Sequence, residues 1–263
     1  MRVRRLGWAG LEVTAAGESL VIDFVGGRME SMLPAGSLVR PDGPVSAALV
    51  THLHFDHADP DAVQSVLAPG GVVLRPRPLD GSEAENYWTA AAEKGFATMS
   101  DVEVVADWEN RAIGPFSVTA VPAVDGFGDP QVSWVVEADG QRIFHGGDTL
   151  FHGFWWLIAG RHGPFDAAFL PVNGAVVDMP QWRPASPLPA DLTPEQAVVA
   201  GMILRARRVV PVHYGLDVAG HYVEVDAAVE EFVRVAGERG VEALVLGVGE
   251  EVHLSPDLAA RVD

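Results

Sequence analysis

The feature that most constrains the fold is a cluster of metal-binding side chains directly after a short apolar segment. Residues 45–50 read VSAALV, which is typical of a buried strand, and residues 51–59 then read THLHFDHAD. Four candidate metal ligands follow this strand within six positions: His52, His54, Asp56 and His57. Alternate side chains of an extended loop project to the same side, so we expect the two histidines of HxH to bind one ion and the Asp–His pair a second. The other interpretation is a His-rich polar loop without metal, but packing alone gives no reason for such a cluster at a strand end.

Three further apolar segments end in a potential ligand. Asp125 follows FSVTAVPAV, Asp148 follows RIFHGG, and His213 follows RVVPV. Each residue alone is equally typical of a turn or of a hydrogen-bonded structural histidine. Because all of them stand at strand ends, we expect them to converge with the first cluster on one site.

The periodicity of the chain alternates strands with helices in both halves, and each half contains an antiparallel hairpin. Helices are predicted within 58–71, 82–96, 155–163, 193–208 and 225–240, with Thr193 as an N-cap, while 26–36 reads as irregular. Residues 109–124 and 243–254 each read as a single strand. This pattern predicts an α/β (α+β) fold, an αββα sandwich of two mixed β-sheets flanked by helices. No repeat or linker interrupts it, so one domain over residues 1–263 is expected.

Composition excludes several classes of function. The chain has no cysteine, so any metal must be held by histidine and carboxylates. Eighteen Lys and Arg against 36 Asp and Glu give a net charge of −18, which disfavours nucleic acid and anionic membranes as partners. No apolar run is long enough for a membrane span or a signal peptide. We therefore expect a cytoplasmic protein with a small-molecule substrate, and leave homo-oligomer formation open.

The combination of HxHxDH at 52–57, GDT at 147–149 and a late strand-end histidine resembles the metallo-β-lactamase-fold superfamily of metallohydrolases. The segments 4–13, 18–24, 120–149 and 193–215 are similar, more narrowly, to the L-ascorbate-6-phosphate lactonase-like branch. The resemblance extends over almost the whole chain and implies the metallo-β-lactamase fold. It also implies one or two divalent ions, bound by the following residues: His52, His54 and residue 125 for the first ion, Asp56, His57 and His213 for the second, and Asp148 as the bridge between them.

One position departs from this family pattern. The branch has a histidine in the sequence VPAVHG, whereas this chain has VPAVDG with Asp125. A carboxylate beside two imidazoles favours manganese or iron over zinc. Alternatively the first site is weakened, or His145 or His152 supplies the missing nitrogen. The other histidines have no motif around them and read as surface or capping residues: His162, His221 and His253. Asp23 is expected beside the site, in contact with a ligand.

The resemblance implies a metal-dependent hydrolase that uses a metal-bound hydroxide on a lactone, ester, amide, thioester or phosphodiester. Asp148 would position the hydroxide, and Asp56 would be both a ligand and a proton shuttle. A mononuclear iron oxidase or dioxygenase and a non-catalytic metal-binding protein are the alternatives.

Segments outside the ligand motifs are candidates for substrate contacts. The Pro-rich residues 176–192 could place Trp182 and Arg183 over the metals as an apolar wall and an anion clamp, or form a surface loop. Three other aromatic residues either line the substrate pocket or belong to the core beneath a helix: Phe151, Trp155 and Trp156.

Overall fold

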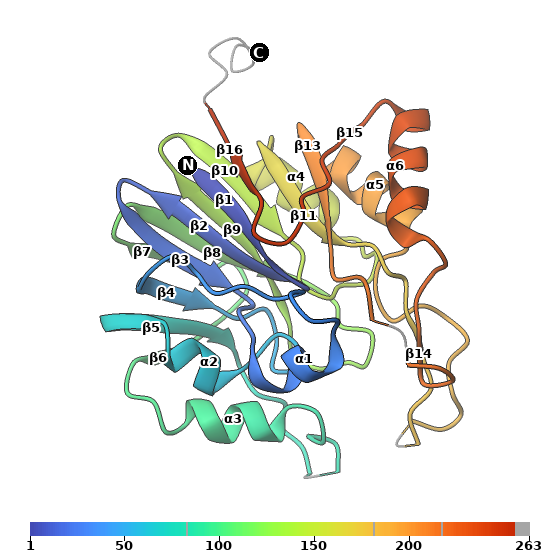
Figure 1. Cartoon of the computed structure of the whole chain (residues 1–263), viewed down its shortest axis with the longest axis horizontal. Coiled ribbons are helices and arrows are strands. Elements are labelled where there is room, and N and C mark those ends of the chain that lie inside the picture. The colour runs from blue at the N-terminus through green and yellow to red at the C-terminus, as the bar shows by residue number, and fades with distance from the viewer. Residues whose placement is uncertain (83, 181, 217, 256–263) are drawn as a thin grey trace.

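Two seven-stranded β-sheets pack face to face in the described part of the chain, with helices on the outer faces (Figure 1). The computed structural model describes residues 1–82, 84–180, 182–216 and 218–255. The first sheet has the order β16 (Glu251–His253), β1 (Arg2–Gly7), β2 (Gly10–Ala15), β3 (Glu18–Ile22), β4 (Val45–Leu49), β5 (Leu67–Pro76), β6 (Val102–Val105). The second has the order β15 (Glu242–Ala243), β13 (Arg208–Val212), β11 (Ala167–Pro171), β10 (Gln141–His145), β9 (Val132–Ala138), β8 (Phe116–Pro122), β7 (Asn110–Ile113). A small separate ribbon pairs β12 (Val176–Val177) with β14 (Tyr222–Val223).

Each sheet is half antiparallel and half parallel, and the connections explain why. Short turns join the antiparallel strands of β1–β2–β3, β7–β8 and β9–β10, such as Asp139–Gly140, where both residues have positive φ. The antiparallel pair β8–β9 is joined instead by the longer loop 123–131. Parallel neighbours need longer crossovers, and each crossover here carries a helix. These helices are α1 (Gly27–Met32), α2 (Pro60–Gln64), α3 (Ala90–Phe96), α4 (Trp155–His162), α5 (Pro194–Ile203) and α6 (Ala228–Arg239).

Three apolar layers hold the sheets and helices together. Between the sheets, Leu11 and Leu20 of the first pack with Trp134 and Phe169 of the second. A second layer joins the outer face of the second sheet to α4, α5 and α6, and a third joins the first sheet to α2 and α3. The predicted αββα sandwich is therefore confirmed. None of the described helices is long and apolar enough to cross a bilayer.

Several element boundaries differ from the sequence predictions. The segment 26–36 contains α1, and the helix predicted within 58–71 ends at Gln64, after which β5 begins at Leu67. Only 90–96 of the predicted helix 82–96 is an α-helix, and residue 83 lies outside the described residues. Residues 109–124 form the β7–β8 hairpin instead of one strand, and 243–254 is interrupted before β16. The Thr193 cap is confirmed, because its side chain accepts from the Gln196 N–H in a capping box.

Candidate metal centre

The predicted ligands lie in loops that leave the carboxyl ends of four strands. The segment 51–59 follows β4, Asp125 follows β8, Asp148 follows β10, and His213 follows β13 directly. The loops of the two sheets meet at one edge of the sandwich. The expected convergence is confirmed, because the His57 and His213 ring centroids are 5.0 Å apart.

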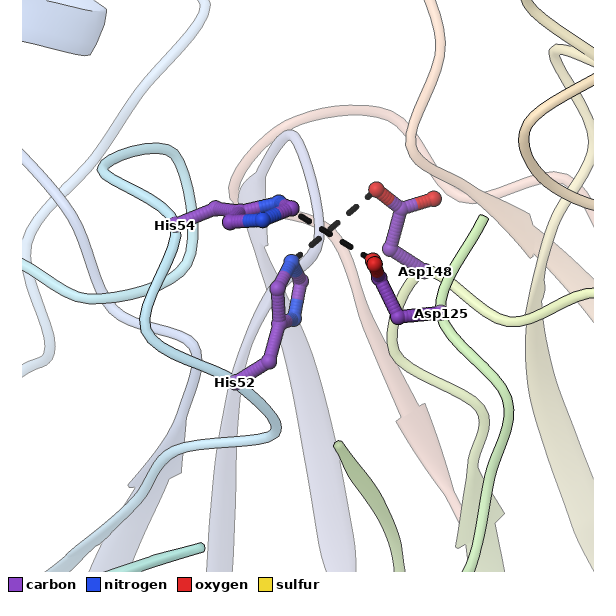
Figure 2. A group of neighbouring side chains, drawn as sticks. All are labelled: His52, His54, Asp125 and Asp148. Carbon is purple, nitrogen blue, oxygen red and sulfur yellow. Dashed lines mark ion pairs between the residues drawn. The ribbon is translucent and has the colours of Figure 1, made fainter. Parts of the chain in front are cut away.

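The first group of candidate ligands brings together both sheets. Its donor atoms lie within 4.8 Å of one another, and its members are His52, His54, Asp125 and Asp148. Figure 2 shows the two imidazoles on one side and the two carboxylates on the other, pointing toward a common centre. His52 Nε2 lies 4.0 Å from Asp148 Oδ2, and His54 Nδ1 lies 4.0 Å from Asp125 Oδ2. All of these side chains are buried.

A second group lies beside the first and consists of Asp56, His57 and His213. Asp56 Oδ2 lies 3.5 Å from both His57 Nε2 and His213 Nε2. Asp148 Oδ2, which faces His52, is also 3.8 Å from His213 Nε2. One oxygen of Asp148 thus stands between the two groups, the position that a bridging ligand requires.

Each candidate imidazole has a polar group close to the ring nitrogen that faces away from the other ligands, although the contact at His213 is too loose to count as a hydrogen bond. His57 Nδ1 is 2.8 Å from Asp23 Oδ2, and His54 Nε2 is 2.8 Å from Asp129 Oδ2. On the remaining two rings, His213 Nδ1 faces an oxygen of Asp191 at 3.4 Å, and His52 Nδ1 faces the Thr51 hydroxyl at 3.1 Å. Such partners fix the tautomer and orient the free nitrogen of a metal ligand. Asp23 lies where it was expected, beside the cluster and in contact with the candidate ligand His57.

The two oxygens of Asp125 have different surroundings. Oδ1 accepts the backbone N–H groups of Phe127 and Asp129 at 2.8 and 3.0 Å, so it holds the loop. Oδ2 is buried without a hydrogen-bond partner and faces His54. A bridge between Asp125 and Thr149 ties this loop to the one that carries Asp148. The carboxylate is therefore fixed with one oxygen available for an ion.

Unpartnered donor atoms show that the cluster fits a divalent metal. Besides His213 Nδ1, which faces Asp191, five buried atoms of the cluster make no hydrogen bond to any described residue: His52 Nε2, His57 Nε2, His213 Nε2, Asp125 Oδ2 and Asp148 Oδ1. Burying each such atom without a partner costs about 1–3 kcal/mol. One cation in each of the two groups would give these atoms partners, and imidazole with carboxylate suits zinc, manganese or iron.

The charges of the cluster shift one another's pKa values. Burial alone would lower the pKa of His213, but Asp148 and Asp191 raise it well above its ordinary value. Burial, together with Asp191, raises the pKa of Asp148 well above its usual range. Burial, with His57 beside it, lowers the pKa of His52. Protons thus balance the carboxylates, and a divalent cation would take their place on binding.

The backbone is strained where it positions the site. His213 and Asp23 have φ of 57° and 45°, a left-handed conformation that costs a residue of this kind about 1–3 kcal/mol. A backbone hydrogen bond holds each residue in place. The His213 N–H donates to the Trp8 carbonyl, and the Asp23 N–H donates to the Leu49 carbonyl. At Gly147 (φ 66°), a Cβ would lie 2.8 Å from the Cβ of Thr51. A glycine there lets the Asp148 loop approach the loop of the HxH histidines.

Sequence reasoning missed three side chains of the site. Asp129 stands four residues after Asp125, a spacing that could have drawn attention to it. Asp191 and Trp8 carry no local signal, because they reach the site only through the fold. The Trp8 indole N–H donates to Asp56 Oδ2 at 3.2 Å, and its ring packs 4.2 Å from that of His213.

The two histidines considered as substitute ligands have other surroundings. His145 Nε2 is 2.8 Å from the Ala9 carbonyl, and its Nδ1 accepts the Gly147 N–H, so both nitrogens are used within the protein. His152 stacks on Trp155 at 4.3 Å and belongs to none of the ligand groups found among the described residues. Neither completes the first group, which leaves Asp125 in that position.

A pocket of about 170 Å³ borders the cluster and is reached by His54, Asp56 and Asp148. Trp182 lines this pocket, which agrees with the interpretation that residues 176–192 place an apolar wall over the site. Arg183 does not line it, because its guanidinium pairs with Asp178 at 2.6 Å on the surface. Of the three aromatic candidates, Trp155 is buried in the helix core and Trp156 is exposed. Phe151 packs against that same core.

Fold and site together define an αββα protein with two neighbouring groups of candidate His/Asp metal ligands at the strand ends. Residues 20–214 match the family described as the Beta-lactamase superfamily domain, and the chain belongs to this family. A protein of Thermococcus onnurineus that is named a metal-dependent hydrolase is 26% identical over 259 residues, covering 97% of this chain and 100% of that one.

Solved structures share the fold. Igni18, a metallo hydrolase from Ignicoccus hospitalis, has a TM-score of 0.65 at 18% identity over 95% of this chain and 97% of that one. CmlA, a diiron β-hydroxylase from Streptomyces venezuelae, has a TM-score of 0.71 at 17% identity over 96% of this chain and 54% of that one. Identities this low show the common fold alone, and the chemistry has to be argued from the site.

The Asp191 carboxylate offers a first test of the centre. Asp191→Asn keeps the oxygen that accepts the Ala175 N–H but removes the charge that faces His213. We expect metal affinity to fall by about 10–100-fold, as is usual when the partner of a ligating histidine is lost. Titration with a competing chelator measures it, with the exposed Asp42→Asn as control. Equal affinity in both variants would contradict the arrangement.

Proposed function

We propose that the chain is a metal-dependent hydrolase that acts on a small molecule. The observation that carries this proposal is the convergence of buried, unpartnered nitrogen and oxygen atoms at the edge of the pocket. His52, His54, Asp125 and Asp148 would hold one ion, and Asp56, His57 and His213 the other. Ions bound there would lower the pKa of a water molecule and polarise the bond under attack.

The protein's own residues supply orientation and a route for the proton. Asp148 stands between the two groups and would position the attacking water. Asp56 borders the pocket, and the Trp8 indole N–H fixes its Oδ2, which leaves Oδ1 to take a proton and pass it to the leaving group. In the metal-free protein, His57 and His213 hold the pKa of Asp56 below its usual range despite burial, so this carboxylate is ionised and can accept a cation.

The bond that is cleaved is a finer part of this proposal. Lactones, esters, amides and phosphodiesters all suit such a centre, and the resemblance of 4–13, 120–149 and 193–215 to the ascorbate-6-phosphate lactonase-like branch favours a lactone. The relatives named metal-dependent hydrolases support hydrolysis in general. For the ions, Asp125 beside two imidazoles favours manganese or iron over zinc.

Elemental analysis of protein purified without chelators, combined with a hydrolysis screen, tests the proposal. The screen uses a γ-lactone, a 4-nitrophenyl ester, an anilide and bis(4-nitrophenyl) phosphate. We expect two equivalents of divalent metal, and turnover that is lost on chelation and restored by the metal. A single iron with oxygen consumption would support an oxidase instead, and protein without bound metal would support a non-catalytic role.

A further inference from the structure

We propose that a second pocket, next to the loop that carries Asp125, binds a small molecule with a primary amide group. This second pocket has a volume of about 700 Å³ and lies where β5 and β6 end. It shares no lining residue with the pocket beside the metal centre. Within the loop, Phe127 lines the pocket beside the metal centre, and residues 128–131 line the second pocket. The inference therefore concerns a separate site and does not depend on the proposed function.

The side chain of Gln131 carries the inference. Gln131 lines the second pocket and is only 7% exposed, yet neither its Oε1 nor its Nε2 has a hydrogen-bond partner. Outside the two ligand groups, it is the only described side chain with two such buried atoms. Buried polar groups are nearly always paired, so an amide with both ends free indicates a missing partner. The rotatable bonds of this long side chain let its amide turn toward a molecule in the pocket.

The free atoms of Gln131 define the chemistry of the missing partner. Its amide has a carbonyl that accepts and an NH₂ group that donates, and a primary amide on the ligand can pair with both. The remaining N–H of the ligand needs an acceptor, and Asp129 Oδ1 is a buried oxygen without a partner in the lining of the same pocket. The other oxygen of Asp129 lies 2.8 Å from His54 Nε2. A bound amide would therefore contact the carboxylate that orients His54.

The charge of the second pocket restricts the ligand further. Its lining includes one arginine, the exposed Arg77, against four carboxylates: Asp107, Glu109, Asp125 and Asp129. In a chain with a net charge of −18, such a lining repels anions. A carboxylate on the ligand also lacks the N–H donors that Asp129 Oδ1 and Gln131 Oε1 require. The ligand is therefore an uncharged or cationic amide.

Apolar side chains provide surface for the rest of the ligand. Pro76, Val104 and Pro130 line the second pocket, and Val104 is 49% exposed on β6, the last strand of its sheet. A volume of about 700 Å³ lies within the usual range for small-molecule sites. The second pocket thus combines an apolar surface with an unsatisfied amide, which is the usual composition of such a site.

NMR titration of the isotope-labelled, zinc-loaded protein with benzamide, acetophenone and benzoate tests the inference. The three probes share one ring and differ in their polar group, which is an amide, a ketone without donors and an anion. We expect benzamide to shift the side-chain NH₂ signal of Gln131 and to bind about tenfold more tightly than acetophenone, as one or two additional hydrogen bonds provide. Benzoate should leave this signal unchanged.

Three variants locate the binding site. Gln131→Met keeps the length of the side chain but removes both polar atoms, so benzamide should bind no more tightly than acetophenone. Val104→Tyr narrows the second pocket from an exposed strand and should weaken benzamide binding by about tenfold, a loss of about 1.4 kcal/mol. Trp182→Ala is the matched control, because Trp182 lines only the pocket beside the metal centre, and it should bind benzamide as the parent does.

Equal affinity for benzamide and acetophenone overturns the inference, and so does the absence of benzamide binding at millimolar concentration. A preference for the amide that survives in Gln131→Met overturns it too, because the amide would then be bound elsewhere. Loss of benzamide binding in Trp182→Ala has the same consequence, since it would place the probe beside the metals. Hydrolysis enters none of these measurements, so the proposed function is tested separately.

Discussion

His57→Ala is expected to remove an ion from the centre and to lower hydrolytic turnover by on the order of 10³-fold. The imidazole is one of three candidate ligands in the second group, and its Nε2 has no other partner. Loss of a catalytic ion removes several kcal/mol of transition-state stabilisation, and about 4 kcal/mol corresponds to 10³ in rate. Metal content and kcat/KM of the purified variant measure the effect.

This variant should still fold, which makes the result interpretable. Asp23, the partner of His57, keeps two other hydrogen bonds, from the Thr51 N–H at 2.8 Å and the Thr51 hydroxyl at 2.7 Å. Both oxygens of the buried Asp23 carboxylate therefore keep a hydrogen bond after the substitution, and we expect a stability cost of roughly 2 kcal/mol. Circular dichroism and thermal unfolding check this. His253→Ala, which removes an exposed histidine on β16, is the matched control. Unchanged metal stoichiometry in His57→Ala would contradict its role as a ligand.

The candidate site was predictable where its residues follow apolar strands. An apolar run such as VSAALV predicts a strand, and the polar residues that follow it mark the end of the strand from which the ligands project. The local sequence is therefore sufficient to predict where these candidate ligands lie. The same holds for Asp125, Asp148 and His213, because strands that run in the same direction bring their ends to one edge. The mixed sheets were predictable for a related reason, since helices between strands require parallel pairing.

The remainder depends on contacts that only the folded chain makes. Trp8 and Asp56 are 48 positions apart, and Asp129 and His54 are 75 apart, so no local spacing links them. Residues 243–254 were predicted to form one strand, because their apolar residues continue past Ala243, where β15 ends. The turn before β16 includes Gly249, whose φ of 81° favours glycine.

Asp125 has two functions that a substitution must separate. Its Oδ1 holds the backbone of Phe127 and Asp129, and through Asp129 it orients His54, while its Oδ2 faces the proposed ion. Asp125→Ala removes both functions, so loss of metal in that variant would have two explanations. Asp125→Asn keeps an oxygen for the two N–H groups and replaces the free oxygen by an amide nitrogen, which is a poor ligand.

The metal selectivity of the parent protein and of the two variants Asp125→Asn and Asp125→His is the last expected result. After growth with equal manganese, iron and zinc, we expect the parent protein to favour manganese or iron, because a carboxylate beside Asp148 suits harder ions. Asp125→Asn should lose the first ion and keep the second, which Asp56, His57 and His213 hold. Asp125→His should shift the content toward zinc, with some loss of stability, since an imidazole cannot accept both N–H groups of the loop. Elemental analysis gives the ratios, and Asp125→Asn with the same ions in the same ratio as the parent would show that Asp125 only shapes the loop.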